Sequence, residues 1–174
     1  PTAVVCPVAA VIRGDEPITV STAIVVCIRN EVPDRVLRNL KPLMSGLAAN
    51  GVGDRFHVYV LSDTNDPAVA VAEEAAVEAW KAADADRDRI VYRRRTDNTG
   101  YKAGNVRDFC ARWGGDYALM LPLDADSLMT GDAIVALVRV MQAHPEIGIL
   151  QSLVVGTPST SPFRPYRAAA VETS

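Results

Sequence analysis

Two acidic residues, Asp124 and Asp126, are separated by one residue and follow an apolar run that extends from Tyr117 to Leu123. In an extended segment, residues i and i+2 point to the same side, so both carboxylates would face one cleft. Two such charges repel each other unless a cation lies beside them. A hard divalent ion prefers oxygen ligands and often takes phosphate oxygens as well. The spacing by itself fits equally well an exposed turn in which an Asp caps the following helix.

Polar groups also follow three other apolar runs. Asn30-Glu31 comes after the first run, Ser62-Asp63 after the second, and the basic run Arg93–Arg95 after the third. The carboxyl ends of parallel strands meet at one edge of an open α/β sheet, which is where such sheets bind ligands. The carboxylate of Asp63 would suit the base of a nucleotide; as a plain turn into the next helix it is less suitable than Asp66. The basic run is either a solvated edge or a group that tunes the charge of the cleft.

The segment Lys102-Ala-Gly-Asn105 comes just before an expected helix. Gly104 allows close approach of the backbone, and the ammonium group of Lys102 suits a phosphate. The alternative is an ordinary loop in which Asn105 caps the helix. The two histidines, His57 and His144, lie within an expected strand and at the end of an expected helix, so we assign them no role.

The elements that must position these groups alternate between strand and helix. Strand patterns are short, apolar and rich in β-branched residues, whereas helix patterns are alanine-rich or carry one apolar face. Strands are expected at 22–28, 56–61, 90–92, 117–123 and 147–155, and helices at 35–49, 67–85, 104–113 and 131–143. Asp34 is expected to cap the first helix, and Pro42 to kink or break it. This alternation predicts an α/β fold: a mostly parallel sheet with helices on both faces.

Length and composition indicate one ordinary globular domain. Of the 174 residues, 49% are hydrophobic and 22% charged, and the net charge of −3 excludes a general attraction to nucleic acid. Three scattered cysteines favour a reducing, cytoplasmic setting over a disulfide framework or a zinc site. We expect residues 1–20 to form an arm or an edge hairpin that turns at 13–17. Residues 21–155 would then form the α/β domain, and 156–174 a loose tail.

The order of the motifs resembles the family 2 inverting glycosyltransferases of the GT-A fold, over roughly residues 22–152. Within that family the nearest likeness is to the bacterial enzymes that build osmoregulated periplasmic glucans. The motifs that carry the resemblance are Ile28-Arg-Asn-Glu31, Leu61-Ser-Asp63, Tyr92-Arg-Arg-Arg95, Lys102-Ala-Gly-Asn105, Leu123-Asp-Ala-Asp-Ser127 and Ile149-Leu-Gln-Ser152. Together they are far more specific than two acids separated by one residue.

The resemblance implies a binding site for a UDP-sugar, the glycosyl donor. Glu31 would lie near the nucleotide, and Asp63 would contact its uracil. Lys102 and Asn105 would line the donor pocket.

The same resemblance implies a metal site at the end of the fourth strand. Asp126 would hold Mg²⁺ or Mn²⁺ on the diphosphate, and Asp124, beside the ion, would face the ribose or the sugar. The cation would act as a Lewis acid toward the UDP leaving group. The donor would be UDP-glucose and the acceptor a growing β-glucan. The full-length protein would lie at the cytoplasmic face of the bacterial inner membrane with the rest of a membrane-embedded synthase; this chain itself would be soluble, with no nucleic-acid partner.

Family members also carry a later acidic motif that supplies the general base, and we identify no such residue in this chain. We therefore expect the isolated chain to bind donor without completing transfer. A nucleotidyltransferase of the same fold would need a glycine-rich loop after the first strand, and Asn30-Glu-Val-Pro33 contains no glycine. A non-catalytic module that binds a nucleotide-sugar or a protein partner remains the alternative.

Overall fold

The computed structural model describes residues 12–152, and a four-stranded sheet forms its centre. The strands are β1 (Thr22–Ile28), β2 (Phe56–Ser62), β3 (Ile90–Arg94) and β4 (Leu119–Asp124), in the order β3-β2-β1-β4. Every pairing is parallel, and Thr22 of β1 lies opposite both Phe56 and Leu119. All four carboxyl ends therefore meet at one edge, as the sequence predicts.

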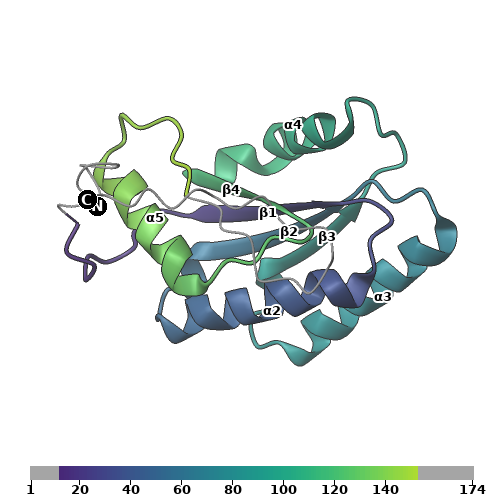
Figure 1. Ribbon diagram of the computed structural model, residues 1–174, viewed down its shortest axis with the longest axis horizontal. Coiled ribbons are helices and arrows are strands. Elements are labelled where there is room, and N and C mark those ends of the chain that lie inside the picture. Colours follow the sequence, from purple (N-terminus) through teal and green to yellow (C-terminus); the bar gives the residue numbers. More distant parts are fainter. Residues whose placement is uncertain (1–11, 153–174) are drawn as a thin grey trace, which may run out of the picture.

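Helices cover both faces of this sheet (Figure 1). They are α2 (Pro33–Ala49), α3 (Pro67–Ala83), α4 (Tyr101–Trp113) and α5 (Gly131–Ala143). The helices α2, α3 and α5 share one hydrophobic core with the sheet, whereas α4 packs on the opposite face. The predicted fold class is confirmed in this respect. None of the helices within residues 12–152 is long and apolar enough to cross a lipid bilayer.

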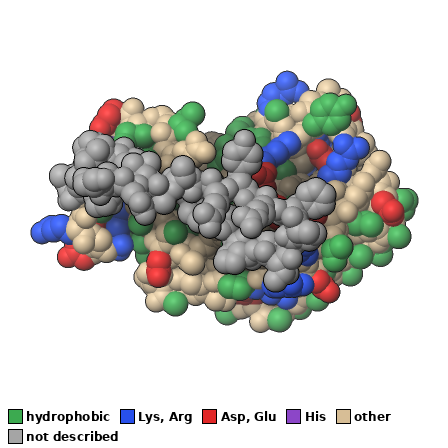
Figure 2. Space-filling model, in the orientation of Figure 1, with side chains coloured by type: hydrophobic (Ala, Val, Ile, Leu, Met, Phe, Trp, Pro, Cys, Tyr) green, Lys and Arg blue, Asp and Glu red, His purple; other side chains and the backbone are tan. Residues whose placement is uncertain are grey.

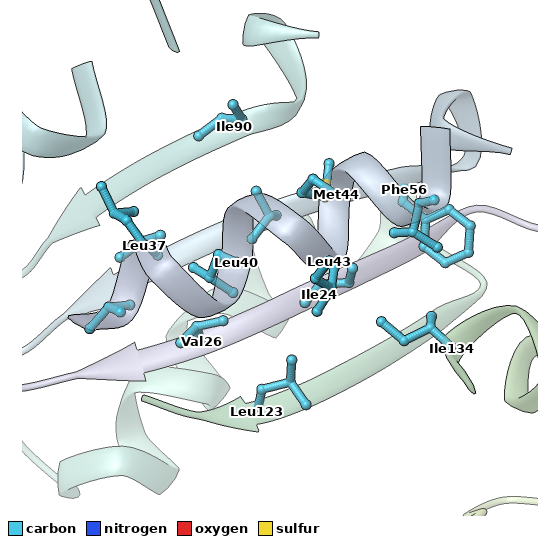
Figure 3. Packing of buried hydrophobic residues seen from close by; sticks show 14 of the residues in the cluster. Ile24, Val26, Leu37, Leu40, Leu43, Met44, Phe56, Ile90, Leu123 and Ile134 are labelled. Atoms are coloured by element: carbon cyan, nitrogen blue, oxygen red, sulfur yellow. The ribbon is translucent and has the colours of Figure 1, made fainter. Parts of the chain in front are cut away.

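The main core lies between α2 and the central strands. Leu37, Leu40 and Leu43 repeat at helical spacing and face Ile24 and Val26 of β1 (Figure 3). Each fully buried aliphatic side chain of this kind contributes about 1.5–3 kcal/mol to folding. The alternate residues of β1 face α4 instead, which is why its sequence is continuously apolar.

The start and the middle of α2 differ from the sequence expectation. Val32 occupies the N-cap position and Pro33 the first helical position, so Asp34 lies inside the first turn and does not cap the helix. A proline at that first position is favourable because its φ is already helical. The helix also continues through Pro42 without a break. The buried neighbours Leu40 and Leu43 hold this turn against the sheet, which offsets the lost hydrogen bond.

The expected fifth strand is wrong for the part that the structure describes. Residues 147–152 form no strand, and Ile149 is 89% exposed; residues 153–155 lie outside the described range. An apolar pattern forms a strand only when it pairs with a neighbouring strand, and residues 147–152 pair with none of the four described strands. The other expected strands and helices are present, with ends shifted by up to three residues.

The segment 12–20 forms an arm along α5 and contains no strand. Ile18 is buried in the main core, and Gln142 of α5 bonds to the backbone of Pro17 and Thr19. The start of the expected arm, residues 1–11, and the expected tail, 156–174, lie outside the described residues.

Candidate functional site

A pocket of about 490 Å³ opens at the carboxyl edge of the sheet, beside the first turn of α4. Five of the six residues singled out from the sequence line it: Glu31, Asp63, Lys102, Asp124 and Asp126. The volume suits a small organic ligand. Figure 2 shows acidic and basic side chains side by side at this end of the molecule, on the right of the view.

The carboxylate of Asp63 is held by a bidentate arginine. Arg95 donates from Nε to Oδ1 at 2.5 Å and from Nη2 to Oδ2 at 2.8 Å. Asp63 is only 5% exposed, and the hydrogen bond that Arg95 donates to this carboxylate raises the pKa of Arg95. Arg95 is therefore a largely covered partner of Asp63 and not a solvated edge. Bidentate pairs of this kind fix both the position and the orientation of the carboxylate.

Asn105, the sixth predicted residue, lies behind the pocket and holds Asp63 from there. Its Nδ2 donates to Oδ1 of Asp63 at 3.0 Å and to the carbonyl oxygen of Leu61 at 3.1 Å. With Nε of Arg95 this makes two donors on Oδ1, whereas Oδ2 accepts only from Arg95 among the described residues. An acceptor position on Oδ2 therefore remains for a ligand.

The sequence analysis places the segment 102–105 just before the helix, with an ordinary loop in which Asn105 is the cap as the alternative, and both expectations are wrong. The helix α4 begins at Tyr101, and Gly100 is its N-cap, so Asn105 lies inside the helix and caps nothing. A Cβ at Gly104 would lie 2.0 Å from the carbonyl oxygen of Thr99. The glycine thus permits close approach of the protein's own loop, which also bonds to Arg95.

Asp124 and Asp126, at the end of β4, line the same pocket, but not because they alternate along an extended strand. Asp124 is the last residue of the strand, and Ala125-Asp126 form a turn closed by the N–H of Ser127 on the carbonyl of Asp124. The alternation of an extended chain does not apply across a turn, so the turn itself brings Asp126 to the pocket. Lys102 forms an ion pair with Asp124, and both side chains are more than half exposed.

The acids are chemically suitable for a divalent cation that also binds phosphate. Within residues 12–152 no group of three or more His, Cys, Asp or Glu residues could enclose a metal by itself. Asp124 and Asp126 would thus supply two carboxylate ligands, and the remaining positions would fall to water or to a diphosphate, as Mg²⁺ prefers. In the described structure the Asp124 carboxylate forms an ion pair with Lys102.

Six other residues line the pocket that the sequence analysis did not single out as site residues: Cys27, Ile28, Arg29, Arg35, Tyr101 and Ala125. Arg29 follows the end of β1 directly, which was the available signal, whereas Arg35 lies in the first turn of α2. Tyr101 is 72% exposed and has a φ of 50°. Cys27 is half-buried, and burial raises the pKa of its thiol. The pocket therefore carries cations as well as acids, as a binding site for an anion with a bound metal requires.

The family model described as Glycosyl transferase family 2 matches residues 23–172. The chain belongs to glycosyltransferase family 2. The domain is similar to proteins named glucans biosynthesis glucosyltransferase H. It is 48% identical over 141 residues to the one from Pseudomonas paraeruginosa and 47% identical over 146 residues to the one from Pseudomonas entomophila. These matches cover 80% of this chain but only 16% of the length of each relative.

Among solved structures, the domain resembles a mannosyltransferase from Pyrobaculum calidifontis that was solved in complex with GDP-Man and Mn²⁺. The TM-score is 0.52 at 17% sequence identity, and the match covers 80% of this chain and 41% of the other. At this identity the likeness concerns the fold, and it confirms the GT-A architecture expected from the sequence.

Proposed function

We propose that this glycosyltransferase domain binds UDP-glucose together with Mg²⁺ or Mn²⁺. One observation carries the proposal: acids and a lysine from three separate chain segments, Asp63, Lys102, Asp124 and Asp126, line one pocket at the carboxyl edge of the sheet. Open α/β sheets bind ligands at this edge. The names of the relatives support glucose as the transferred sugar.

In this proposal Asp63 and Glu31 hold the nucleotide base. Arg95 and Asn105 fix the Asp63 carboxylate, so that the remaining acceptor position on Oδ2 can take an N–H of uracil. Glu31, at the end of the loop after β1, borders the same space. The ion pair with Arg95 and the hydrogen bond from Asn105 hold the Asp63 carboxylate in one orientation before the donor arrives, which lowers the cost of binding.

Lys102, Asp124 and Asp126 hold the diphosphate end of the donor. Asp124 and Asp126 would coordinate the cation, which would neutralise the charge that develops on the UDP leaving group. Asp124 also faces the ribose or the sugar. Lys102, which pairs with Asp124 in the ligand-free structure, would supply an ammonium to the phosphates if the Asp124 carboxylate held the cation.

We further propose that the full-length protein transfers this glucose, with inversion, to a growing β-glucan of the osmoregulated periplasmic type. It would do so at the cytoplasmic face of a bacterial inner membrane, where the rest of a membrane-embedded synthase lies. Each acid of the described pocket has a proposed role in holding donor or metal, so none is assigned to the proton of the acceptor hydroxyl. We therefore expect the 174-residue chain alone to bind donor without transferring glucose.

The test is a calorimetric titration of the chain with UDP and with UDP-glucose, with and without Mn²⁺. We expect binding that depends on the metal, and Asp126→Asn should weaken it by at least about tenfold, since even outer-shell partners of metal ligands contribute that much. Asp88→Asn is the matched control, because the Asp88 side chain is 97% exposed and lies outside the pocket.

The proposal fails if the wild-type chain gives no metal-dependent heat, or if Asp126→Asn binds as well as Asp88→Asn. A chain that binds no nucleotide in either condition would instead favour a protein-interaction module of the same fold.

A further inference from the structure

One buried carboxylate near the pocket has no role in the proposed function so far. Glu73, on the second turn of α3, is 1% exposed. An acid in an alanine-rich helix ordinarily faces solvent, as its neighbour Glu74 does. Burying a carboxylate is costly unless hydrogen bonds compensate for the lost water.

Three hydroxyl groups supply those bonds. Ser62 donates to Oε2 at 2.6 Å, Thr64 donates to Oε1 at 2.5 Å, and Tyr92 donates to Oε2 at 3.1 Å. Burial, and secondarily the nearby charge of Glu73, raises the pKa of Tyr92 to about 12, so the phenol stays a donor at ordinary pH. The carboxylate thus joins α3 to the ends of two neighbouring strands, β2 and β3.

Two of these three bonds hold the residues on either side of Asp63. Successive side chains of an extended segment point to opposite faces. Ser62 and Thr64 point to Glu73 on the α3 face, while Asp63 points to Arg95 and to Asn105 of α4. The backbone N–H of Thr64 also donates to Oγ of Ser62 at 3.1 Å. Glu73 therefore holds the residues on both sides of Asp63, and with them the direction in which the Asp63 side chain points.

The same network reaches the loop after β1. The N–H of Asn30 donates to Oγ1 of Thr64 at 2.8 Å, and Asn30 holds a left-handed φ of 54°. Its side-chain carbonyl accepts from the N–H groups of Asn65 and Asp66. Asn30 lies between Arg29 and Glu31, which both line the pocket. One buried carboxylate is thus connected to both loops that flank the proposed base site.

We propose that Glu73 is a positioning residue for nucleotide binding, acting through Thr64 and Ser62 on the orientation of Asp63 and of the Asn30 loop. The nucleotide part of this inference rests on the function proposed above. The orientation of the two loops does not, because it concerns the ligand-free chain.

The experiment compares Glu73→Gln with the adjacent, exposed Glu74→Gln and with Val77→Ala. Val77 is buried on the same helix and belongs to the core, so its truncation destabilises the domain without removing a hydrogen bond of the network. Thr64→Val is a second test, since it keeps the side-chain shape and removes the hydroxyl that links Glu73 to Asn30. For each variant, amide hydrogen exchange of the ligand-free chain and UDP affinity with Mn²⁺ are measured.

In Glu73→Gln and Thr64→Val we expect exchange to rise by about tenfold or more at Asn30 and at residues 63–66, and UDP affinity to fall by a similar factor. Glu74→Gln should match the wild type. Val77→Ala should exchange faster throughout the core yet keep the wild-type affinity in its folded fraction.

The inference is overturned if Glu73→Gln raises exchange evenly, as Val77→Ala does, and leaves UDP affinity unchanged, because Glu73 would then serve stability alone. It is also overturned if Thr64→Val leaves both loops protected, a result that stays decisive should Glu73→Gln fail to fold. If the wild-type chain binds no UDP, the proposed function fails, while the exchange at Asn30 and 63–66 still decides the positioning of the loops.

Discussion

Three acids of this domain have three different kinds of partner. Asp63 is paired with a buried guanidinium, Glu73 accepts from three hydroxyls, and Asp124 meets an exposed ammonium. Buried pairs such as Asp63–Arg95 are costly to break, by about 3–5 kcal/mol when one partner is removed. An exposed pair is worth only about 0–1 kcal/mol, so its partner exchanges easily. In the proposed function, the described pocket therefore combines a firmly held base site with an adaptable phosphate and metal site.

The exposed pair leads to a prediction for Lys102→Met. Removing the ammonium frees the Asp124 carboxylate, so Mn²⁺ affinity in the absence of nucleotide should rise by a few-fold, within the range expected of an exposed ion pair. Titration of Mn²⁺ followed by electron paramagnetic resonance measures the free ion directly.

Lys81→Met is the matched control, since Lys81 pairs with Glu78 on the surface of α3, outside the pocket. Equal Mn²⁺ affinities in the two variants would show that Lys102 does not compete with the ion.

At the scale of elements, the crossing of α2 and α5 supports the turn that carries Asp126. Gly131 starts α5, and a Cβ there would lie 2.5 Å from the carbonyl carbon of Gly46 and 2.7 Å from the N of Leu47. These are backbone atoms, so they cannot rotate away as a side chain can. The helix α5 is capped by Thr130, four residues after the turn at 125–126.

We expect Gly131→Ala to destabilise the domain by about 1–3 kcal/mol, because α5 must move away from α2 to make room. Urea unfolding measures the loss. Gly115→Ala is the control, since a Cβ at Gly115 meets no atom within 4 Å. If both variants lose the same stability, the close crossing is not what restricts position 131.

At the scale of the whole molecule, the pH dependence of folding near neutrality should depend on one histidine. Burial, and secondarily the charge of Arg89, lowers the pKa of His57 below its ordinary value. Its Nδ1 is buried and has no hydrogen-bond partner among the described residues. The folded state therefore resists protonation at this position.

The sign of the effect follows from linkage. As the pH falls through about 6.5, the unfolded chain takes up a proton at His57 that the folded chain does not, so the free energy of unfolding decreases. We expect His57→Phe to remove most of this decrease between pH 7.5 and 5.5, as measured by urea unfolding at each pH. His144→Gln should retain it. A slope that is the same in wild type and His57→Phe would contradict the assignment.

The sequence by itself determined the four strands and four helices that the structure confirms, and the edge of the sheet that carries the site. The bounds of β1 and α5 agree with the expectation because strand and helix patterns, the Thr130 cap and the stop at Pro145 are local signals. Once the strands are parallel, the residues that follow them must meet at one edge. Glu31, Asp63, Asp124 and Asp126 could therefore be grouped without coordinates.

Only the tertiary structure decided the partners of these groups. Arg95 reaches Asp63 because β3 lies next to β2, and Lys102 reaches Asp124 because α4 starts beside the end of β4. Glu73 could not be distinguished from a surface glutamate by sequence, because nothing in the local pattern shows which face of α3 meets Ser62 and Tyr92. Secondary structure depends mainly on neighbours along the chain, whereas ion pairs and buried hydrogen bonds depend on elements that only the fold brings together.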